Sequence, residues 1–317
     1  MWPTSENLAC ESDIDRWYEK FSPLLEQFIE NESIDSKFKM SFKSVYLPLA
    51  KWIESKQAAG PVIIGINGAQ GSGKSTLSKL LVQVLENIFN KTVLHLSIDD
   101  LYLSRDKRLT RANAIHPLLK VRGVPGTHDT DLGIKILKSI KSASIDEIKL
   151  PVFDKAIDDL LPENHWQCIQ KKIDIVLFEG WCVAAKPQSQ AQLSLPVNLL
   201  EEKEDADGSW RHYVNKQLSG QYKEWFSYID YLIMLNVPDM ESVYEWRALQ
   251  EKKLIQSSQH NNHYAMSAQA LKEFIMYFER ITRQCLGEMP ERADVLLNIN
   301  KDHQITAINI KKPSDQV

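Results

Sequence analysis

Residues 62 to 76 join an apolar run, a glycine-rich loop and the start of an amphipathic helix without interruption. The run Val62–Ile66 is apolar on both faces, which is typical of a strand inside a parallel sheet. From Leu77 onward the apolar residues recur at spacings of three and four, which predicts a helix. A buried strand, a tight turn and a helix in this order predict a βα unit of an α/β sheet. No other feature of the chain limits the fold as strongly.

The glycine-rich loop, residues 68 to 75, matches the pattern GxxxxGK[ST] at every required position. Glycines let the backbone curl so that its N–H groups face phosphate oxygens, and the following helix adds the positive end of its dipole. In this pattern the lysine reaches the β- and γ-phosphates and the last hydroxyl binds Mg²⁺. We expect ATP and Mg²⁺ as ligands, although the pattern alone is also compatible with a glycine-rich turn that binds nothing. The expected nucleotide-binding residues are Gly68, Ala69, Gln70, Gly71, Ser72, Gly73, Lys74, Ser75 and Thr76.

Further apolar runs have the length of strands. They cover residues 92–98, 173–178 and 231–237, and two alternating runs at 295–299 and 305–310 flank a polar turn. Long helical or polar connections separate the first three runs, as in a parallel sheet, and the last two predict a closing hairpin. The expected fold class is α/β, a P-loop NTPase-type parallel sheet flanked by helices.

Three segments lie outside this pattern. Apolar residues at helical spacing between Ile14 and Phe28, and again between Phe42 and Ile53, predict a helical N-terminal extension over residues 1–60. Residues 186–212 combine Gln/Ser-rich sequence with the acidic run Glu201–Asp205, and we interpret them as a flexible, solvated insert. Residues 104–130, rich in proline, glycine and charge, could instead be a functional loop.

Charge and cysteine content exclude several classes of partner. The 317 residues contain 38 Lys plus Arg and 42 Asp plus Glu, so the chain has no broad basic field for nucleic acid. Four separated cysteines without a CxxC pair favour free thiols in a reducing compartment. No stretch approaches the roughly 20 apolar residues of a membrane span, and the N-terminus lacks the pattern of a secretory signal. We expect a cytoplasmic protein with no nucleic-acid or membrane partner, and we leave its oligomeric state open.

Acids follow two of the expected strands, where open α/β sheets build their sites. Asp99 and Asp100 end the second strand, and a carboxylate there can accept the proton of an attacking hydroxyl or hold a metal-bound water. The alternative is that an acid only caps the next helix, which we favour for Asp100. Glu179 ends the strand at 173–178, where it would face the loop and help to position Mg²⁺ unless it forms a buried salt bridge.

These motifs together resemble a known superfamily. The P-loop, the S-x-D-D-L-Y segment ending at Tyr102, the L-P-V-F-D segment ending at Asp154 and the F-E-G segment at 178–180 resemble phosphoribulokinase, uridine kinase and pantothenate kinase. Within that superfamily the chain looks like the D-glycerate 3-kinases of plants and their fungal and bacterial relatives. The residues that carry the closer likeness are 121–129, Trp181, Val214, Asn215, Tyr222, Trp225 and 244–247, and the likeness spans roughly residues 61 to 285.

The resemblance implies roles for individual residues. Asp99 corresponds to the base that activates the acceptor hydroxyl. The implied metal positions are Ser75, Asp99 and Glu179, with Glu179 as the second acidic Mg²⁺ position. Arg247 lies in the lid segment that closes over the phosphates, at about residues 240–270 of a kinase domain covering residues 61–317. Tyr102, Arg122, His128 and Asp154 fall where relatives contact the acceptor, and a guanidinium such as that of Arg122 can grip a carboxylate with two hydrogen bonds. Two of these residues could instead have no part in binding the acceptor: Arg122 could be an ordinary surface residue, and His128 could be a structural hydrogen-bond donor.

The resemblance also implies an activity. We expect an ATP-dependent kinase that transfers the γ-phosphoryl group to a hydroxyl of a small acid, with D-glycerate as the leading acceptor. Lys74 and Arg247 would stabilise the moving phosphoryl group, and Asp99 would receive the proton. Two alternatives remain: a kinase for another acceptor, such as a nucleoside, a pantothenate-like alcohol or a different sugar acid, and a non-catalytic ATP-binding regulatory module.

Overall fold

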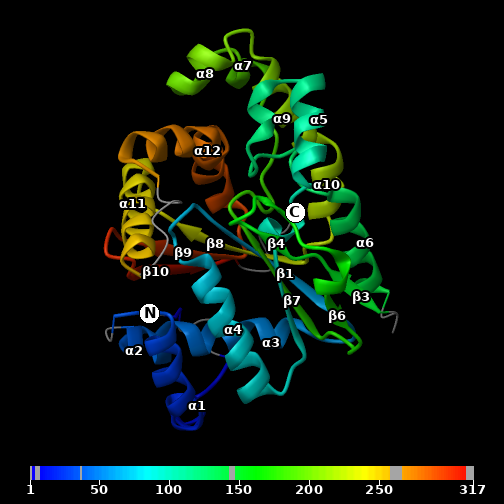
Figure 1. The fold of residues 1–317 in the computed structure, drawn as a ribbon. Coiled ribbons are helices and arrows are strands. Elements are labelled where there is room, and N and C mark those ends of the chain that lie inside the picture. The colour runs from blue at the N-terminus through cyan, green and yellow to red at the C-terminus, as the bar shows by residue number, and fades with distance from the viewer. Residues whose placement is uncertain (1, 4–7, 36–37, 143–146, 258–265, 312–317) are drawn as a thin grey trace.

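A six-stranded sheet forms the centre of the protein in the computed structural model, which describes residues 2–3, 8–35, 38–142, 147–257 and 266–311 (Figure 1). The strand order is β10-β9-β8-β1-β7-β2, and every pairing is parallel except that of β9 with β10. The predicted strands and the closing hairpin are therefore confirmed. The sheet strands are β1 (Val62–Gly68), β2 (Val93–Ser97), β7 (Ile175–Gly180), β8 (Tyr231–Asn236), β9 (Val295–Ile299) and β10 (Ile305–Ile310).

The register of the central strands determines which residues meet at the carboxyl edge of the sheet. Strand β7 lies between β1 and β2, and Glu179 pairs with Ile66 on one side and with Ser97 on the other. Every residue of β1 and β7 is buried, as expected for apolar strands covered on both faces. The P-loop, Glu179 and the turn after β2 therefore start from neighbouring positions.

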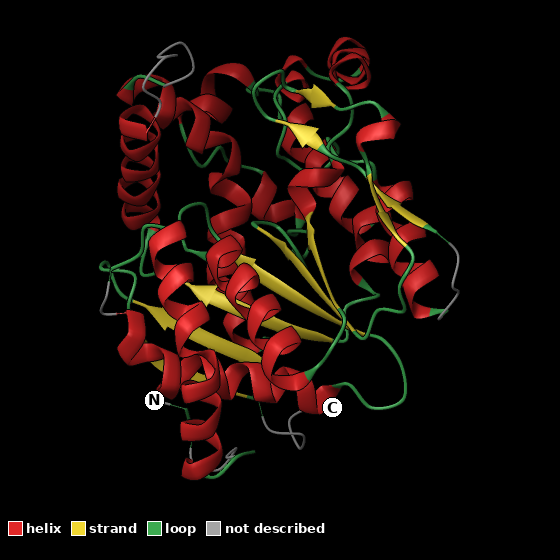
Figure 2. Ribbon diagram, turned by 60° about the horizontal axis from the view of Figure 1, so that its bottom comes forward, coloured by secondary structure: helices red, strands yellow, loops and turns green. Residues whose placement is uncertain are grey.

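Helices cover both faces of the sheet (Figure 2). One apolar core contains Ile64 and Ile66 of β1, and a second contains Ile63, because successive side chains of a strand point to opposite faces. The first core joins the sheet to α1 (Glu11–Asn31), α2 (Phe38–Ser41), the π-helical turn η2 (Phe42–Tyr46), α3 (Leu47–Lys56), α4 (Lys74–Phe89) and α11 (Met240–Ser257). The second joins it to η3 (Ile98–Leu101), α5 (Arg105–Ala114), η4 (Pro117–Lys120), α6 (Thr130–Lys141), α9 (Ser209–Ser219) and α10 (Gln221–Phe226), and α12 (Ala268–Glu288) contributes to both.

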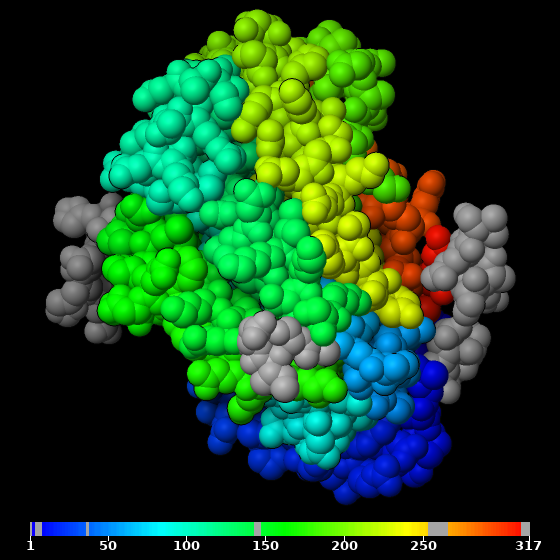
Figure 3. Space-filling model, turned by 90° about the vertical axis from the view of Figure 1, so that its right-hand side faces the viewer, coloured from blue at the N-terminus to red at the C-terminus, as the bar shows by residue number. Residues whose placement is uncertain are grey.

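The N-terminal helices over residues 11–31 and 38–56 pack directly on the sheet layer. Trp17 of α1 meets Phe89 of α4 edge to face at 5.0 Å, and Phe21 stacks on Phe42 at 5.3 Å. In the space-filling view the blue and light-blue N-terminal residues form the lower part of one continuous body (Figure 3). The domain boundary at residue 60 stays a prediction.

Two short hairpins lie between α6 and β7. One pairs β3 (Ile148–Leu150) with β6 (Gln167–Ile169) and the other pairs β4 (Phe153–Asp154) with β5 (Asp159–Leu160). The 3-10 turn η5 (Glu163–His165) connects β5 to β6. A further 3-10 turn, η7 (Met289–Glu291), precedes β9. The β4–β5 hairpin becomes important below, because its turn reaches the end of β2.

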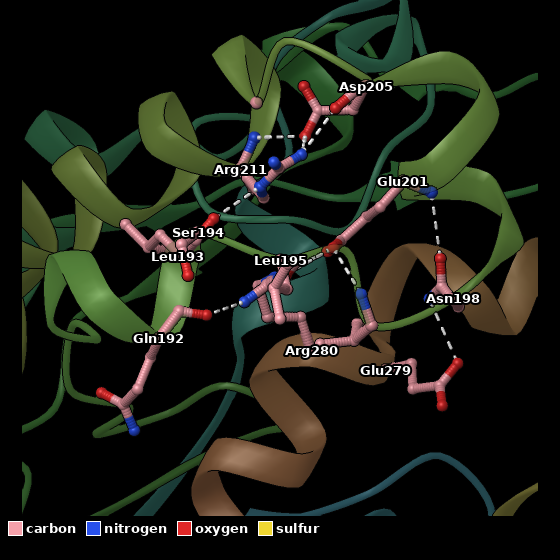
Figure 4. Close-up of polar contacts among 12 residues, drawn as sticks. Gln192, Leu193, Ser194, Leu195, Asn198, Glu201, Asp205, Arg211, Glu279 and Arg280 are labelled. Carbon is pink, nitrogen blue, oxygen red and sulfur yellow. Dashed lines mark hydrogen bonds and ion pairs between the residues drawn. The ribbon is translucent and has the colours of Figure 1, made fainter.

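Residues 186–212 are largely exposed, as expected for a solvated insert, but the acidic run is not solvated throughout, and the flexibility of the segment stays a prediction. The segment forms α7 (Gln190–Leu193), α8 (Leu199–Glu204) and the start of α9, and Glu201 and Asp205 of the acidic run are completely buried. Arg280 of α12 binds both carboxylate oxygens of Glu201, at 2.7 and 2.6 Å, and Arg211 binds Asp205 at 2.9 Å (Figure 4). Each buried acid is neutralised by an arginine, Asp205 by Arg211 of the same segment and Glu201 by the distant Arg280 of α12.

Candidate active site

The P-loop backbone has the conformation that its glycines permit. Gly71 and Gly73 have φ angles of +79° and +88°, in the left-handed region that side chains disfavour, and α4 begins at Lys74. A Cβ on Gly71 would lie 2.7 Å from the Cβ of Trp246, so α11 packs directly against the loop. No side chain caps the start of α4, which leaves its first N–H groups available to a phosphate.

Ser75 and Glu179 meet as the sequence predicts for a metal site. The Ser75 hydroxyl donates to Oε1 of Glu179 at 2.8 Å, while Oε2 of Glu179 is buried and accepts no hydrogen bond from the described residues. Burial by itself raises the pKa of Glu179, but the nearby His95 and Lys74 outweigh it and hold that pKa below its usual value. An ionised carboxylate with an open oxygen beside a serine hydroxyl suits Mg²⁺. The residues therefore fit the ion, with phosphate and water as its remaining ligands.

The described residues contain no cluster of three or more His, Cys, Asp or Glu that could hold a metal by itself. This agrees with the way Mg²⁺ is usually bound beside nucleotides, by one or two protein groups plus phosphate oxygens and water. Ser75 and Glu179 fulfil that requirement, and Asp99 is the next carboxylate along the same edge of the sheet.

Asp99 lies in the 3-10 turn η3 directly after β2, where Ser97 accepts a hydrogen bond from its backbone N–H. The Tyr102 hydroxyl donates to Oδ1 of Asp99 at 2.6 Å, and Lys155 Nζ donates to Oδ2 at 2.8 Å. Burial raises the pKa of Asp99, but the charges of Lys155 and Lys74 and the Tyr102 hydroxyl outweigh it and lower that pKa to about 2. Asp99 is therefore ionised at neutral pH.

Asp100 does not cap a helix, contrary to the interpretation that we favoured. The N-cap of η3 is Ser97, and the N-cap of α5 is Ser104, whose hydroxyl accepts from Lys107 N–H. Burial, followed by the adjacent charge of Asp99, raises the pKa of Asp100 to about 6. The pKa values of these two adjacent carboxyl groups are therefore shifted in opposite directions, that of Asp99 downward and that of Asp100 upward.

Tyr102 and His128 form a stacked pair beneath this turn. Their rings lie 4.7 Å apart, and both side chains are buried, with exposed fractions of 5% and 1%. Nδ1 of His128 hydrogen-bonds to the Tyr222 hydroxyl at 2.6 Å, and burial lowers the pKa of His128 to about 3. The His128 ring thus packs against the Tyr102 ring, and the Tyr102 hydroxyl donates a hydrogen bond to Asp99.

Arg122 and Asp154 both lie at the β4–β5 hairpin. Arg122 forms an ion pair with Asp158 and covers the Phe153 ring at 5.6 Å, so its guanidinium is already engaged. Asp154 Oδ1 accepts from Ala156 N–H at 2.8 Å and thereby shapes the hairpin turn. The structure brings both residues close to Tyr102, whose ring meets Phe153 edge to face at 5.1 Å.

Arg247 lies on α11, beside the P-loop. Its guanidinium pairs with Glu251 one turn along the helix and covers the Phe274 ring of α12 at 5.9 Å. The backbone N of Arg247 is 3.5 Å from the position of a Cβ on Gly71, so the helix itself touches the loop. Of the expected lid, residues 258–265 lie outside the described residues.

Four residues at this site were missed by the sequence reasoning. Lys155 reaches Asp99, His95 lies 3.8 Å from Glu179, Trp246 packs on the P-loop, and His303 Nε2 hydrogen-bonds to the carbonyl of Gly71 at 2.8 Å. A signal existed for His95, because it precedes Ser97 by two residues in β2 and so shares its face. Lys155 directly follows the L-P-V-F-D segment, but nothing local indicates its partner.

Comparison with known proteins agrees with this geometry. An uncharacterized kinase of Schizosaccharomyces pombe, mug58, is 32% identical over 239 residues, which cover 73% of this chain and 83% of that protein. The chain belongs to the P-loop kinases. It is also similar to the chloroplastic D-glycerate 3-kinase of Arabidopsis thaliana, at 27% identity over 83% of this chain and 58% of that protein, so it spans little more than half of that relative.

Other comparisons agree with the fold of this kinase. The D-glycerate 3-kinase structure from Cryptococcus neoformans has a TM-score of 0.69 at 22% identity, covering 84% of this chain and 97% of that chain. A model of the KAP family P-loop domain matches residues 42–194. Pantothenate kinase of Streptococcus pneumoniae is 23% identical over 92% of both chains. The enzyme is thus a phosphotransferase that uses ATP and acts on a small molecule, and none of its described helices is long and apolar enough to cross a bilayer.

Proposed function

We propose that this kinase phosphorylates a hydroxyl of a small acid, with D-glycerate as the leading acceptor. The observation that carries the proposal is the pair of acids at neighbouring strand ends: Asp99 after β2, and Glu179 at the end of β7 in contact with Ser75 of the P-loop. A protein that only binds nucleotide has no need of a second carboxylate beside the phosphates. The similarity to D-glycerate 3-kinases supports the acceptor.

Each residue has a part in the proposed reaction. The P-loop N–H groups and Lys74 would hold the β- and γ-phosphates. Ser75 and Glu179 would hold Mg²⁺, which would neutralise charge on the transferred group. Asp99 accepts a hydrogen bond from the acceptor hydroxyl and takes its proton as the new P–O bond forms and ADP leaves. Arg247 would have to exchange Glu251 for phosphate to act as a lid residue.

Asp99→Asn tests the base. The amide keeps the shape and the hydrogen bond from Tyr102 but cannot accept the proton, so we expect ATP binding to persist while turnover falls by about 10²- to 10⁴-fold. Asp100→Asn is the matched control, because it removes the neighbouring acid, and its turnover should stay within a few-fold of wild type. Near-normal turnover of Asp99→Asn, or a larger loss for Asp100→Asn, would refute the assignment.

The acceptor is tested by ADP release from the purified protein with D-glycerate, other hydroxy acids, uridine, ribulose phosphate and pantothenate. ADP release with D-glycerate and with none of the last three supports the proposal. Tight ATP binding without turnover on any acceptor would instead favour an ATP-binding regulatory module. A cytoplasmic location stays a prediction from sequence, to be checked by cell fractionation, since the relative from Arabidopsis is chloroplastic.

A further inference from the structure

The turn of the β4–β5 hairpin is held in a fixed shape over the end of β2. Phe153 pairs with Leu160 and Asp154 with Asp159, and the Asp154 carboxylate binds the N–H of Ala156 inside the turn. Asp159 also accepts from the backbone N–H of Arg105 at 3.0 Å, which ties the hairpin to the start of α5. The side chain that this turn presents to the site is that of Lys155.

Lys155 is a cation with unused hydrogen-bonding capacity next to the proposed base. Its Nζ lies 2.8 Å from Oδ2 of Asp99, and its side chain is 59% exposed. An ammonium group has three donors, and among the described residues Asp99 is the only partner of this one. Two donors of Lys155 therefore remain available to a ligand that approaches Asp99.

The nearby arginines are less available than Lys155. Asp158 pairs with both Arg122 and Arg108, and Arg108 is 1% exposed, with further bonds to the carbonyls of Leu103, Lys120 and Asp158. A ligand carboxylate would have to share the Arg122 guanidinium with Asp158, and the Arg122 side chain is only 27% exposed, against 59% for Lys155. The ligand carboxylate could reach Lys155 without breaking any ion pair, because the ammonium can hold Asp99 and a second carboxylate together.

We propose that Lys155 determines the preference of this kinase for acceptors that carry a carboxylate close to the hydroxyl. The inference rests on the proposed function: the acceptor hydroxyl binds Asp99 while its carboxylate binds Lys155. With contacts of about 2.8 Å on each side of the Asp99–Lys155 pair, the two acceptor oxygens lie at most about 8 Å apart. This limit fits a hydroxy acid of a few carbons, and a nucleoside has no carboxylate to use the site.

The test compares each acid with its uncharged amide. Steady-state kinetics are measured with D-glycerate and with D-glyceramide for wild type, Lys155→Met and Lys155→Arg. We expect Lys155→Met to lower kcat/KM for the acid by about 10- to 100-fold, mainly through KM, because one charge-assisted contact is lost. The KM for ATP should stay within about threefold. The kcat/KM for the amide should fall much less than that for the acid, because the amide loses only the effect of the Lys155 charge on Asp99. Lys155→Arg should keep most of the preference for the acid.

Lys43→Met is a matched control. Lys43 lies in η2, it is half-exposed like Lys155, and its Nζ lies 2.7 Å from the carboxylate of Asp15. Lys43→Met should change none of these constants. The inference is overturned if the ratio of acid to amide is unchanged in Lys155→Met, or if both substrates and ATP are affected equally, as a purely structural role would cause. Should Lys155→Met fail to fold, the same ratio is measured in Lys155→Gln.

The same data separate this inference from the proposed acceptor. If wild type ignores D-glycerate but uses another hydroxy acid, the glycerate proposal fails, and Lys155 is judged on that acid and its amide. If wild type uses only uncharged acceptors, both fail. A wild type that uses D-glycerate and D-glyceramide equally well overturns the role of Lys155 alone.

Discussion

Two buried glutamates, Glu179 at the P-loop and Glu201 in the insert, have similar burial and opposite surroundings. Both are at most 3% exposed. Arg280 binds both oxygens of Glu201, and Val197 N–H adds a third bond, whereas Oε2 of Glu179 has no partner among the described residues. Buried polar groups are almost always satisfied in folded proteins. A complete set of partners marks Glu201 as structural, and the open oxygen of Glu179 supports the proposal that this residue binds a ligand.

The largest expected effect is the loss of stability on replacing Arg280, the partner of Glu201. Arg280→Met would leave Glu201 charged and unpaired in the interior, so we expect the free energy of unfolding to fall by about 3–5 kcal/mol. Urea unfolding followed by tryptophan fluorescence measures the change. Glu202→Gln, which removes the exposed neighbouring acid of α8, is the control and should stay within about 0.5 kcal/mol. A loss below about 1 kcal/mol for Arg280→Met would mean that the insert is not held by this pair.

His128 is a second buried residue with an open polar atom, because its Nε2 has no hydrogen-bond partner within the part of the chain that the structure describes. Its folded-state pKa of about 3 lies below the ordinary 6.5, so below pH 6.5 the unfolded chain binds more protons than the folded one. Stability is therefore complete above pH 6.5 and declines as the pH falls toward 3, by up to about 1.4 kcal/mol per unit. Asp100, with its raised pKa of about 6, acts in the opposite direction between its unfolded value of 3.8 and pH 6.

The difference between wild type and His128→Asn isolates the histidine, because Asp100 is present in both. Between pH 6.5 and 5, wild type should lose up to about 2 kcal/mol more than the variant in urea unfolding. Stability curves that run parallel over this range would show that His128 can be protonated without cost in the folded protein.

The smallest expected change in stability is at Glu179 itself. Glu179→Gln removes a charge that no arginine or lysine among the described residues pairs with directly, so the free energy of unfolding should change by no more than about 1 kcal/mol. Kinase turnover should nevertheless fall, with a higher Mg²⁺ concentration needed for half-maximal rate. If this variant is destabilised as much as Arg280→Met, Glu179 is a structural acid and the contrast with Glu201 is lost.

The P-loop could be predicted from sequence because the residues that shape its backbone and bind phosphate lie within one short segment. Glycines, lysine and serine at fixed spacing determine its backbone and its ligand together, and the apolar runs determine the strands that bring Asp99 and Glu179 to one edge. The order of strands along the sheet follows from packing between distant segments and not from any local pattern.

The insert and the hairpin could not be predicted in the same way. The acidic residues at 201–205 have the composition of a solvated segment. The arginine that forms the ion pair with Glu201 lies 79 positions away in the sequence. Lys155 and Asp99 are 56 positions apart, and the ion pair between Arg122 and Asp158 spans 36. Ion pairs leave no periodic signal in sequence, so their partners became known only from the three-dimensional arrangement.

The contact between His303 and the carbonyl of Gly71 has a consequence for the newly made chain. The loop at Gly71 is synthesised early, but the histidine that touches it follows 232 residues later. At about 5–20 residues per second, translation takes on the order of 10 to 50 seconds to cover that distance. During this interval the nascent polypeptide contains the complete nucleotide-binding motif but lacks some of the residues that contact it. His303 can reach Gly71 only after the β9–β10 hairpin has left the ribosome.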